Sequence, residues 1–252
     1  MSEFTGNYAT WEDALADADG YDVPRILERV REGALKVKNG EAAYEMDSLT
    51  YDKLDFFHPF LAQLLHVASC KGNRLNVLDF GGSLGSTYYL YRSFFTELNE
   101  LKWNIVEQPH FVQVGRREFA EGPLKFYYFV EDCIAKEHPD VILFSGSLQY
   151  LEDPYGFLGH VIRFGFEYIL FDRTPFIDLD DRITLENVPD FVYGASYPAW
   201  FFNEQNFLGM FADDYELLDK FDSFESWDLG DTRAQNKGML FRRKIAGGLS
   251  GG

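Results

Sequence analysis

An alternation of short apolar runs with helix-compatible stretches, from residue 75 to residue 171, constrains the fold of this chain most strongly. The apolar runs have the length and composition of buried strands, and helical patterns lie between them. The runs are 75–80, 103–107, 125–129, 140–144 and 168–171. Strands that alternate with helices form βαβ units, so the sequence predicts a mainly parallel sheet that is buried on both faces.

The segments that flank this region have other patterns. The first third predicts helices and no strand, with helices at 11–16, at about 24–38 and at 54–69. Residues 174–198 are rich in Asp, Pro and Tyr and have no clear period, which predicts a long irregular segment of functional importance. A helix at 204–211 and strands at 215–221 and 237–241 complete the expected elements.

These patterns predict three parts of unequal size. Residues 1–72 form an N-terminal helical cap or lid, residues 73–244 a Rossmann-like domain, and residues 245–252 a flexible Gly-rich tail. A length of 252 residues suits one large domain, or one domain with an appended subdomain.

Charge and cysteine content exclude several classes of partner. The chain has 23 Lys and Arg against 41 Asp and Glu, a formal net charge of −18. Such an acidic surface argues against nucleic acid and against anionic membranes, both of which need a basic surface. Cys70 and Cys133 have neither pairing nor metal-ligand spacing, so we expect no metal site. With neither a signal peptide nor a membrane-spanning run in view, we expect a cytoplasmic protein.

A glycine-rich turn directly follows the first predicted strand. The sequence Asp79-Phe-Gly81-Gly82-Ser83-Leu-Gly85 leads from that strand into a helix. Glycine lets the backbone approach a ligand closely, and a helix N-terminus offers unpaired N–H groups. We therefore expect Asp79, Gly81, Gly82, Ser83 and Gly85 to bind a cofactor.

Acidic and polar residues end the following strands. Glu107 ends the second strand, where an acid can accept both ribose hydroxyls of a nucleoside. Ser145 and Gln149 follow the fourth strand, on the ligand side of an open α/β sheet. The same region holds Glu131 and Asp132 after the third strand, which can also simply cap a helix.

The acid-x-Gly-x-Ser-x-Gly register resembles motif I of class I S-adenosylmethionine (SAM)-dependent methyltransferases. Nearly the whole chain is similar to one family, the methyltransferases encoded in bacterial surface-polysaccharide and related biosynthetic gene clusters. The segments that carry this resemblance are 7–11, 78–85, 106–110, 148–154, 172–176 and 195–200.

The resemblance implies a Rossmann-like, doubly wound, mostly parallel seven-stranded sheet with SAM as the cofactor. It also implies that an acid after the third strand, Asp132 in preference to Glu131, receives the adenine amino group. The loop after the fourth strand, which carries Ser145 and Gln149, would lie beside the sulfonium.

Candidates for acceptor chemistry lie near the predicted strand ends. Methyl transfer to a hydroxyl needs alignment and often a base. We predict His110, Asp172 and Arg173 as catalytic residues: His110 follows the Glu107 strand tip, Asp172 is a base or the partner of Arg173, and Arg173 can hold a carboxylate or phosphate. Predicted substrate contacts are Tyr150, Thr174, Tyr197 and Trp200, although packing of the loop on the core explains such rings equally well.

The leading interpretation is a SAM-dependent methyltransferase that O-methylates a small molecule, a sugar or polysaccharide precursor. One alternative is an NAD(P)- or nucleotide-sugar-dependent Rossmann enzyme, although the third glycine, Gly85, comes one residue early for that motif. A second is a methyltransferase-like binding protein without activity. A homodimer through the N-terminal segment is an open option.

Overall fold

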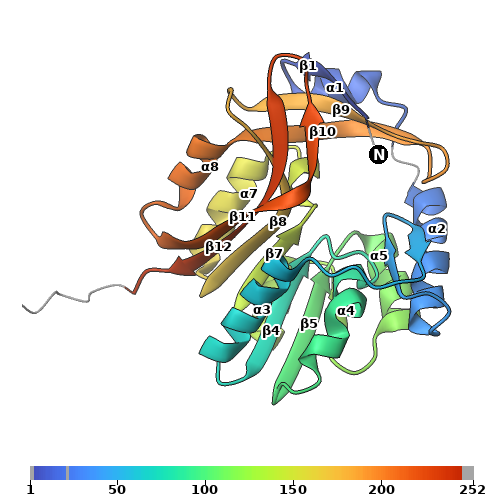
Figure 1. The fold of residues 1–252 in the computed structure, drawn as a ribbon, viewed down its shortest axis with the longest axis vertical. Coiled ribbons are helices and arrows are strands. Elements are labelled where there is room, and N and C mark those ends of the chain that lie inside the picture. The colour runs from blue at the N-terminus through green and yellow to red at the C-terminus, as the bar shows by residue number, and fades with distance from the viewer. Residues whose placement is uncertain (1–2, 21–22, 246–252) are drawn as a thin grey trace, which may run out of the picture.

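The computed structural model describes residues 3–20 and 23–245, which form a large mixed sheet with helices on both faces (Figure 1). The strands are β1 Glu3–Tyr8, β2 Tyr44–Met46, β3 Leu49–Tyr51, β4 Arg74–Phe80, β5 Glu100–Val106, β6 Leu124–Tyr127, β7 Val141–Ser145, β8 Tyr168–Ile177, β9 Arg182–Val188, β10 Ala195–Asn203, β11 Tyr215–Asp228 and β12 Arg233–Arg243. The helices are α1 Trp11–Asp17, α2 Val23–Lys38, α3 His58–Cys70, α4 Ser86–Tyr91, α5 Pro109–Val114, α6 Val130–Glu137, α7 Pro154–Phe164 and α8 Glu204–Phe211. Of the predicted tail, residues 246–252 lie outside the described residues.

Parallel pairing dominates the centre of the sheet. The strand order is β1-β9-β10-β8-β7-β4-β5-β6, and β12 pairs with both β8 and β11. Strands β6, β5, β4, β7 and β8 run parallel, whereas β9, β1, β12 and β11 join through antiparallel pairs. The prediction of a mainly parallel α/β sheet is thus confirmed for this central part.

Neighbouring residues of the central strands point to opposite faces of the sheet. Val77 belongs to an apolar cluster with residues of α2, α3, α4 and α5. The next residue, Leu78, belongs to a second cluster with residues of α6, α7 and α8. Burial on both faces explains why these strands are near-continuous apolar runs.

The predicted count of seven strands is wrong, because the described residues form a ten-stranded sheet. Part of the difference lies in residues 174–198, which were expected to be irregular and instead contribute to β8, β9 and β10. Strand β9 lies between β1 and β10 and is buried at nearly every position, its polar residues included. Polar and apolar residues alternate over 182–186, which is a local strand signal that the prediction of an irregular segment did not use.

The expectation of no strand before residue 75 is also wrong. Strand β1 pairs with β9, almost 180 residues away, and most of its side chains are exposed. Phe4 and Tyr8 are the exceptions: both are partly buried, and the Phe4 ring packs edge-on against Phe201 at 4.9 Å and Trp227 at 5.0 Å. The hairpin β2–β3 turns at Asp47 and Ser48, which have φ values of 51° and 70°. Such short strands leave almost no local pattern.

Helix predictions were more successful in this region. Helix α1 begins after Thr10, whose side chain accepts a hydrogen bond from Asp13 N, as expected of an N-cap. Helix α3 begins at His58 rather than 54, with Pro59 in its first turn. Within the described residues, no helix is long and apolar enough to cross a membrane.

Candidate active site

A cavity of about 850 Å³ opens at the carboxyl ends of the central parallel strands. Strand β4 has β5 on one side and β7 on the other. The chain therefore leaves β4 toward β5 and β6 and returns on the opposite side of β4 with β7. Ligands bind at such a switch point in open α/β sheets.

The loop after β4 lines this cavity, and its conformation requires glycine at positions 81 and 82. Gly81 has φ of +72°, and a Cβ there would lie 2.6 Å from Ser147 Cβ. A Cβ on Gly82 would lie 2.5 Å from the carboxyl group of Asp79. Both contacts are too close for a side chain, so the loop needs glycine to pack against its neighbours.

Asp79 packs with its side chain directly against this loop at Gly82. Its side chain is 1 % exposed, and Trp103 Nε1 donates a hydrogen bond to its Oδ2 over 2.9 Å. Burial raises the pKa of Asp79 to about 7, although the Trp103 hydrogen bond opposes this effect. Asp79 does not line the cavity, so its carboxyl group acts on the glycine loop and not on a bound molecule.

Glu107, at the tip of β5, lines the cavity beside the same loop. Its Oε2 accepts a hydrogen bond from Gln108 N over 2.5 Å, and the Ser83 backbone N–H also stabilises its ionised form. Burial nevertheless raises the pKa of Glu107. The carboxylate is thereby fixed next to the glycine loop, where it can accept hydrogen bonds from a ligand.

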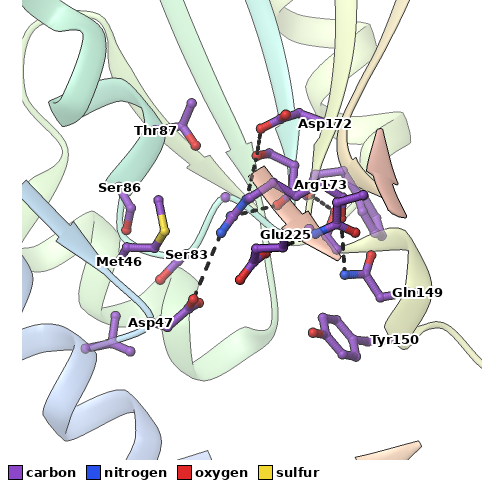
Figure 2. A pocket seen from close by; sticks show the side chains of 18 of the residues that line it. Met46, Asp47, Ser83, Ser86, Thr87, Gln149, Tyr150, Asp172, Arg173 and Glu225 are labelled. Carbon is purple, nitrogen blue, oxygen red and sulfur yellow. Dashed lines mark hydrogen bonds and ion pairs between the residues drawn. The ribbon is translucent and has the colours of Figure 1, made fainter. Parts of the chain in front are cut away.

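Arg173, in β8, lines the same cavity (Figure 2). It has φ of 50°, an unusual conformation for a residue with a side chain. Its Nη2 donates to Ser145 O over 3.3 Å, and its Nη1 lies 4.0 Å from Asp47 Oδ2. Ser145 Oγ in turn donates to Asp172 Oδ2 over 3.0 Å. Backbone strain of this kind concentrates at functional sites.

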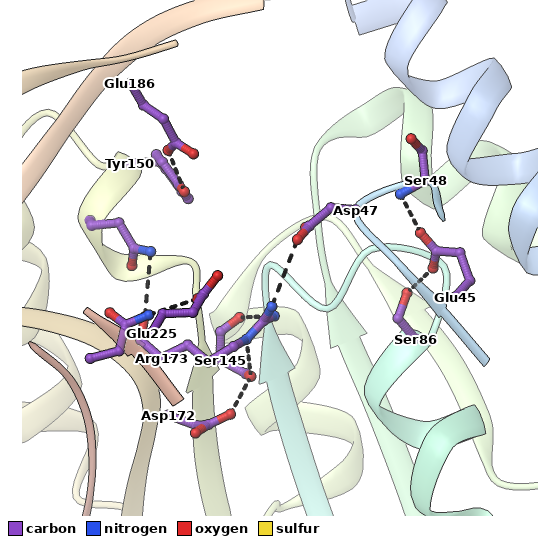
Figure 3. Close-up of polar contacts among 12 residues, drawn as sticks. Glu45, Asp47, Ser48, Ser86, Ser145, Tyr150, Asp172, Arg173, Glu186 and Glu225 are labelled. Atoms are coloured by element: carbon purple, nitrogen blue, oxygen red, sulfur yellow. Dashed lines mark hydrogen bonds and ion pairs between the residues drawn. The ribbon is translucent and has the colours of Figure 1, made fainter. Parts of the chain in front are cut away.

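A tyrosine and a buried glutamate, Tyr150 and Glu186, also line the cavity and point toward one another (Figure 3). Tyr150 Oη donates a hydrogen bond to Glu186 Oε2 over 2.8 Å, and Glu186 is 6 % exposed. Burial and the neighbouring Glu186 hold the pKa of Tyr150 well above its ordinary value. The ring of Tyr197 packs edge-on against that of Tyr150.

The β2–β3 hairpin closes the cavity on the side of α4. Glu45 accepts hydrogen bonds from Ser86 Oγ over 2.5 Å and from Ser48 N over 2.7 Å. Burial raises the pKa of Glu45 to about 7. Together with the contact between Asp47 and Arg173, these bonds attach the hairpin to both sides of the cavity (Figure 3).

No protein-family model matches this sequence, and no curated protein matches it. Among solved structures, one similar fold is 1,6-didemethyltoxoflavin-N1-methyltransferase of Burkholderia thailandensis with bound 1,6-didemethyltoxoflavin and S-adenosylhomocysteine (SAH). It has a TM-score of 0.50 and 13% sequence identity, over 97% of this chain and 96% of that chain. Another is the N-terminal domain of EvdMO1, in the presence of SAH and D-fucose, with a TM-score of 0.50 and 15% identity over 89% of this chain and 98% of that chain. The chain shares its fold with these two structures.

Ten of the residues predicted from sequence line the cavity together. They are Gly81, Gly82, Ser83, Glu107, Ser145, Gln149, Tyr150, Asp172, Arg173 and Tyr197. They come from the loops after β4, β5 and β7 and from strands β8 and β10. The strand-end argument therefore located one common site.

Six other predicted residues lie outside the cavity lining. Asp79, in β4, precedes the glycine loop, and Gly85 follows it as the N-cap of α4, with φ of 102°. His110 is exposed in α5, and Asp132 is exposed in the first turn of α6. Thr174 is buried in β8, and Trp200 Nε1 donates to Leu151 O over 3.0 Å.

Several cavity residues were not predicted from the sequence. They are Glu45, Asp47, Glu186, Glu225 and Asn236. Each lies on a strand that approaches the site from the N-terminal or C-terminal part of the chain, or in the turn between two such strands. Glu225 lies where the pairing of β11 with β12 shifts register. A single acid in a polar stretch has no local feature that distinguishes it from a solvated one.

Proposed function

We propose that this protein is a class I SAM-dependent methyltransferase that acts on a small-molecule acceptor. The observation that carries the proposal is the glycine loop at the switch point of the sheet, with the Glu107 carboxylate beside it at the edge of a large cavity. The similar folds of two SAH-bound structures support it. NAD(P) and nucleotide sugars fit less well, because their phosphates would enter a cavity whose charged lining residues are seven acids and one arginine.

The residues on the cofactor side fit SAM. Glycines 81 and 82 have no Cβ, so backbone can approach a ligand closely, and Glu107 can accept hydrogen bonds from two ribose hydroxyls. When bound, SAM would supply a methyl group attached to a positively charged sulfonium. As the acceptor takes the methyl group, the C–S bond breaks and its electron pair stays on sulfur. The acidic residues of the lining suit the positive charge of the sulfonium.

Tyr150 and Glu186 are our proposed proton acceptors on the acceptor side. A hydroxyl placed against Tyr150 Oη can pass its proton to that oxygen while the Tyr150 proton moves to Glu186, 2.8 Å away. Asp172 and Arg173 remain on the cavity wall to position the acceptor. His110 is exposed away from the lining, so we assign the proton transfer to Tyr150 and Glu186 instead.

A sugar or a polysaccharide precursor is the acceptor that we propose, with O-methylation as the reaction. The sequence resemblance to methyltransferases of polysaccharide clusters supports this choice. Aromatic side chains around the acceptor side, including Tyr150 and Tyr197, suit the apolar faces of a sugar ring.

Calorimetric titration with SAM and SAH tests the cofactor, with NADPH and UDP-glucose as controls. We expect one-site binding of both adenosyl ligands. Glu107→Gln should weaken SAH binding by about tenfold or more, because a charge-assisted hydrogen bond contributes about 1.5–3 kcal/mol. The exposed Glu152→Gln serves as the matched control. Binding of NADPH or UDP-glucose in place of SAH would overturn the proposal.

Turnover separates an enzyme from a binding protein that has lost its chemistry. We expect methyl transfer from labelled SAM to a sugar acceptor, with kcat reduced in Tyr150→Phe and Glu186→Gln while SAH affinity is kept. SAH binding without any transfer to a broad panel of hydroxylated acceptors would favour the non-catalytic alternative.

A further inference from the structure

The charges on the cavity wall are strongly unbalanced. Seven carboxyl groups line it: Glu45, Asp47, Asp55, Glu107, Asp172, Glu186 and Glu225. Against them stands a single guanidinium, that of Arg173, and the described lining includes neither lysine nor histidine. The carboxylates therefore make the electrostatic potential in the cavity negative, and this potential would repel an anionic acceptor.

Arg173 contributes little to binding such an anion, because its positive charge is already offset by neighbouring carboxyl groups. Its guanidinium already lies 4.0 Å from Asp47 Oδ2 and donates to Ser145 O. Asp172 and Glu225 also act on it electrostatically, as does Asp47. The acceptor side thus keeps an excess of negative charge even after its one cation is counted.

Unpaired hydrogen-bond acceptors provide an independent observation in the same place. Gln149 and Asn236 line the cavity at 7 % and 3 % exposure, and each has a buried amide oxygen that lacks a partner among the described residues. The orientation of each amide is determined by its nitrogen, since Gln149 Nε2 donates to Arg173 O and Asn236 Nδ2 to Glu225 Oε2. Asp172 Oδ1 is unpaired as well. The two amide oxygens can only accept hydrogen bonds, as can Asp172 Oδ1 when the carboxyl group is ionised, so these atoms favour a ligand that donates hydrogen bonds.

We propose that the acceptor is a hydroxylated compound that carries a protonated amine, an amino sugar or an amino polyol. This inference rests on the proposed methyltransferase function and specifies its substrate. An ammonium group has three donors and no acceptor, so it matches both the excess of carboxylates and the unpaired oxygens. Glu225 accepts the hydrogen bond of Asn236 Nδ2 and is our choice of partner for the ammonium group, while a hydroxyl of the same molecule would face Tyr150 and Glu186 (Figure 3).

The carboxyl groups at this end also respond to their crowding. Burial raises the pKa of Glu225, and the nearby Asp47 raises it further, whereas Arg173 opposes the shift. Burial likewise raises the pKa of Asp172. A bound ammonium group would stabilise the ionised form of both carboxyl groups and so lower their pKa values. By linkage, ionisation of these carboxyl groups strengthens the binding of the ammonium group.

Three sugars that share the galactose stereochemistry and differ in charge test the proposal. D-galactosamine has an amine at C2, D-galactose has only hydroxyls, and D-galacturonate has a carboxylate at C6; each is titrated into the protein saturated with SAH. We expect galactosamine to bind about tenfold or more tightly than galacturonate, with galactose between them, and the difference should shrink with added salt. Equal affinities, tighter galacturonate binding, or no binding of galactosamine would overturn the proposal.

A single isosteric variant locates the recognition. Glu225→Gln keeps an oxygen for Asn236 Nδ2 but removes the charge, so the advantage of galactosamine over galactose should fall by about tenfold. SAH affinity should be unchanged, and Glu152→Gln, exposed and outside the cavity, should resemble the unaltered protein. An unaltered preference for galactosamine in Glu225→Gln would contradict the assignment.

The two proposals fail differently in these measurements. Without SAH binding, the methyltransferase function itself is rejected. With SAH binding and a preference for the carboxylate sugar, the function stands and only the acceptor class is wrong.

Discussion

At the scale of single residues, the close approach of Gly82 to Asp79 determines the shape of the glycine loop after β4. The loop backbone passes so close to the Asp79 carboxyl group that a Cβ on Gly82 would lie 2.5 Å from it. Asp79 cannot retreat, because it is buried and hydrogen-bonded to Trp103. Loop geometry and the charge of Asp79 are therefore linked.

Gly82→Ala should displace the loop and weaken SAH binding by about tenfold or more, because a displaced loop would lose at least one well-placed hydrogen bond to the ligand. Calorimetry measures the affinity and circular dichroism monitors the fold. Gly209→Ala in α8 is the matched control, since a Cβ there meets no atom within 4 Å. Full SAH affinity in Gly82→Ala would contradict this account of the loop.

Asp79 should make the protein less stable at neutral pH than at mildly acidic pH. Its pKa rises from 3.8 to about 7 on folding, so between these values the folded chain holds a proton that the unfolded chain releases. The resulting loss of stability as pH rises through this window is at most about 4 kcal/mol, from about 1.36 kcal/mol per pKa unit.

Asp79→Asn tests this linkage, because it removes the charge and keeps an oxygen for Trp103. We expect it to raise Tm relative to the unaltered protein at pH 8 and to have little effect near pH 4. Asp178→Asn, at an exposed position, is the control. A difference in Tm that did not change with pH would argue against a raised pKa for Asp79.

At the scale of elements, strand β1 connects the N-terminus to the outer part of the sheet. It pairs with β9, and α1 packs near both β9 and β10 (Figure 1). This arrangement supports the β9–β10 pair, which supplies Glu186 and Tyr197 to the cavity. The N-terminal segment is therefore part of the structure that builds the acceptor side.

Phe4→Ala should destabilise the protein by about 2–3 kcal/mol, somewhat less than a fully buried Phe, because its ring is half-buried between Phe201 and Trp227. Denaturant unfolding measures this loss. Phe191→Ala is the control, since its side chain is 67 % exposed. Equal losses in the two variants would show that β1 contributes little to stability.

At the scale of the whole molecule, the chain as well as the cavity lining has an excess of acidic over basic residues. The chain has a formal net charge of −18, and the cavity wall holds seven carboxyl groups with one guanidinium. Added salt screens such a field, with a Debye length of about 8 Å at 0.15 M. A cationic ligand should therefore lose affinity as salt is added.

The comparison of SAM with SAH isolates this effect, because the two differ by one methyl group and one positive charge. We expect the dissociation constant of SAM to increase more steeply with NaCl concentration than that of SAH. Titration calorimetry at several NaCl concentrations gives both slopes. Parallel slopes would mean that the field of the carboxyl groups does not reach the sulfonium position.

The sequence alone determined the parallel core, the glycine turn and the position of Glu107. These features depend on short-range signals, since a strand, a turn and a helix follow one another within about 15 residues. Their common location followed from one rule, that ligands bind at the carboxyl ends of parallel strands.

Only the tertiary structure decided the outer strands and the acceptor side. Asp19 N donates to Ser196 Oγ, and β1 pairs with β9, across more than 170 residues of sequence. Asp47 from the N-terminal hairpin and Glu225 from β11 both come within reach of Arg173 by the same kind of long-range pairing. A polar residue has the same local pattern whether it is solvated or buried at a site, so its role depends on what the fold brings next to it.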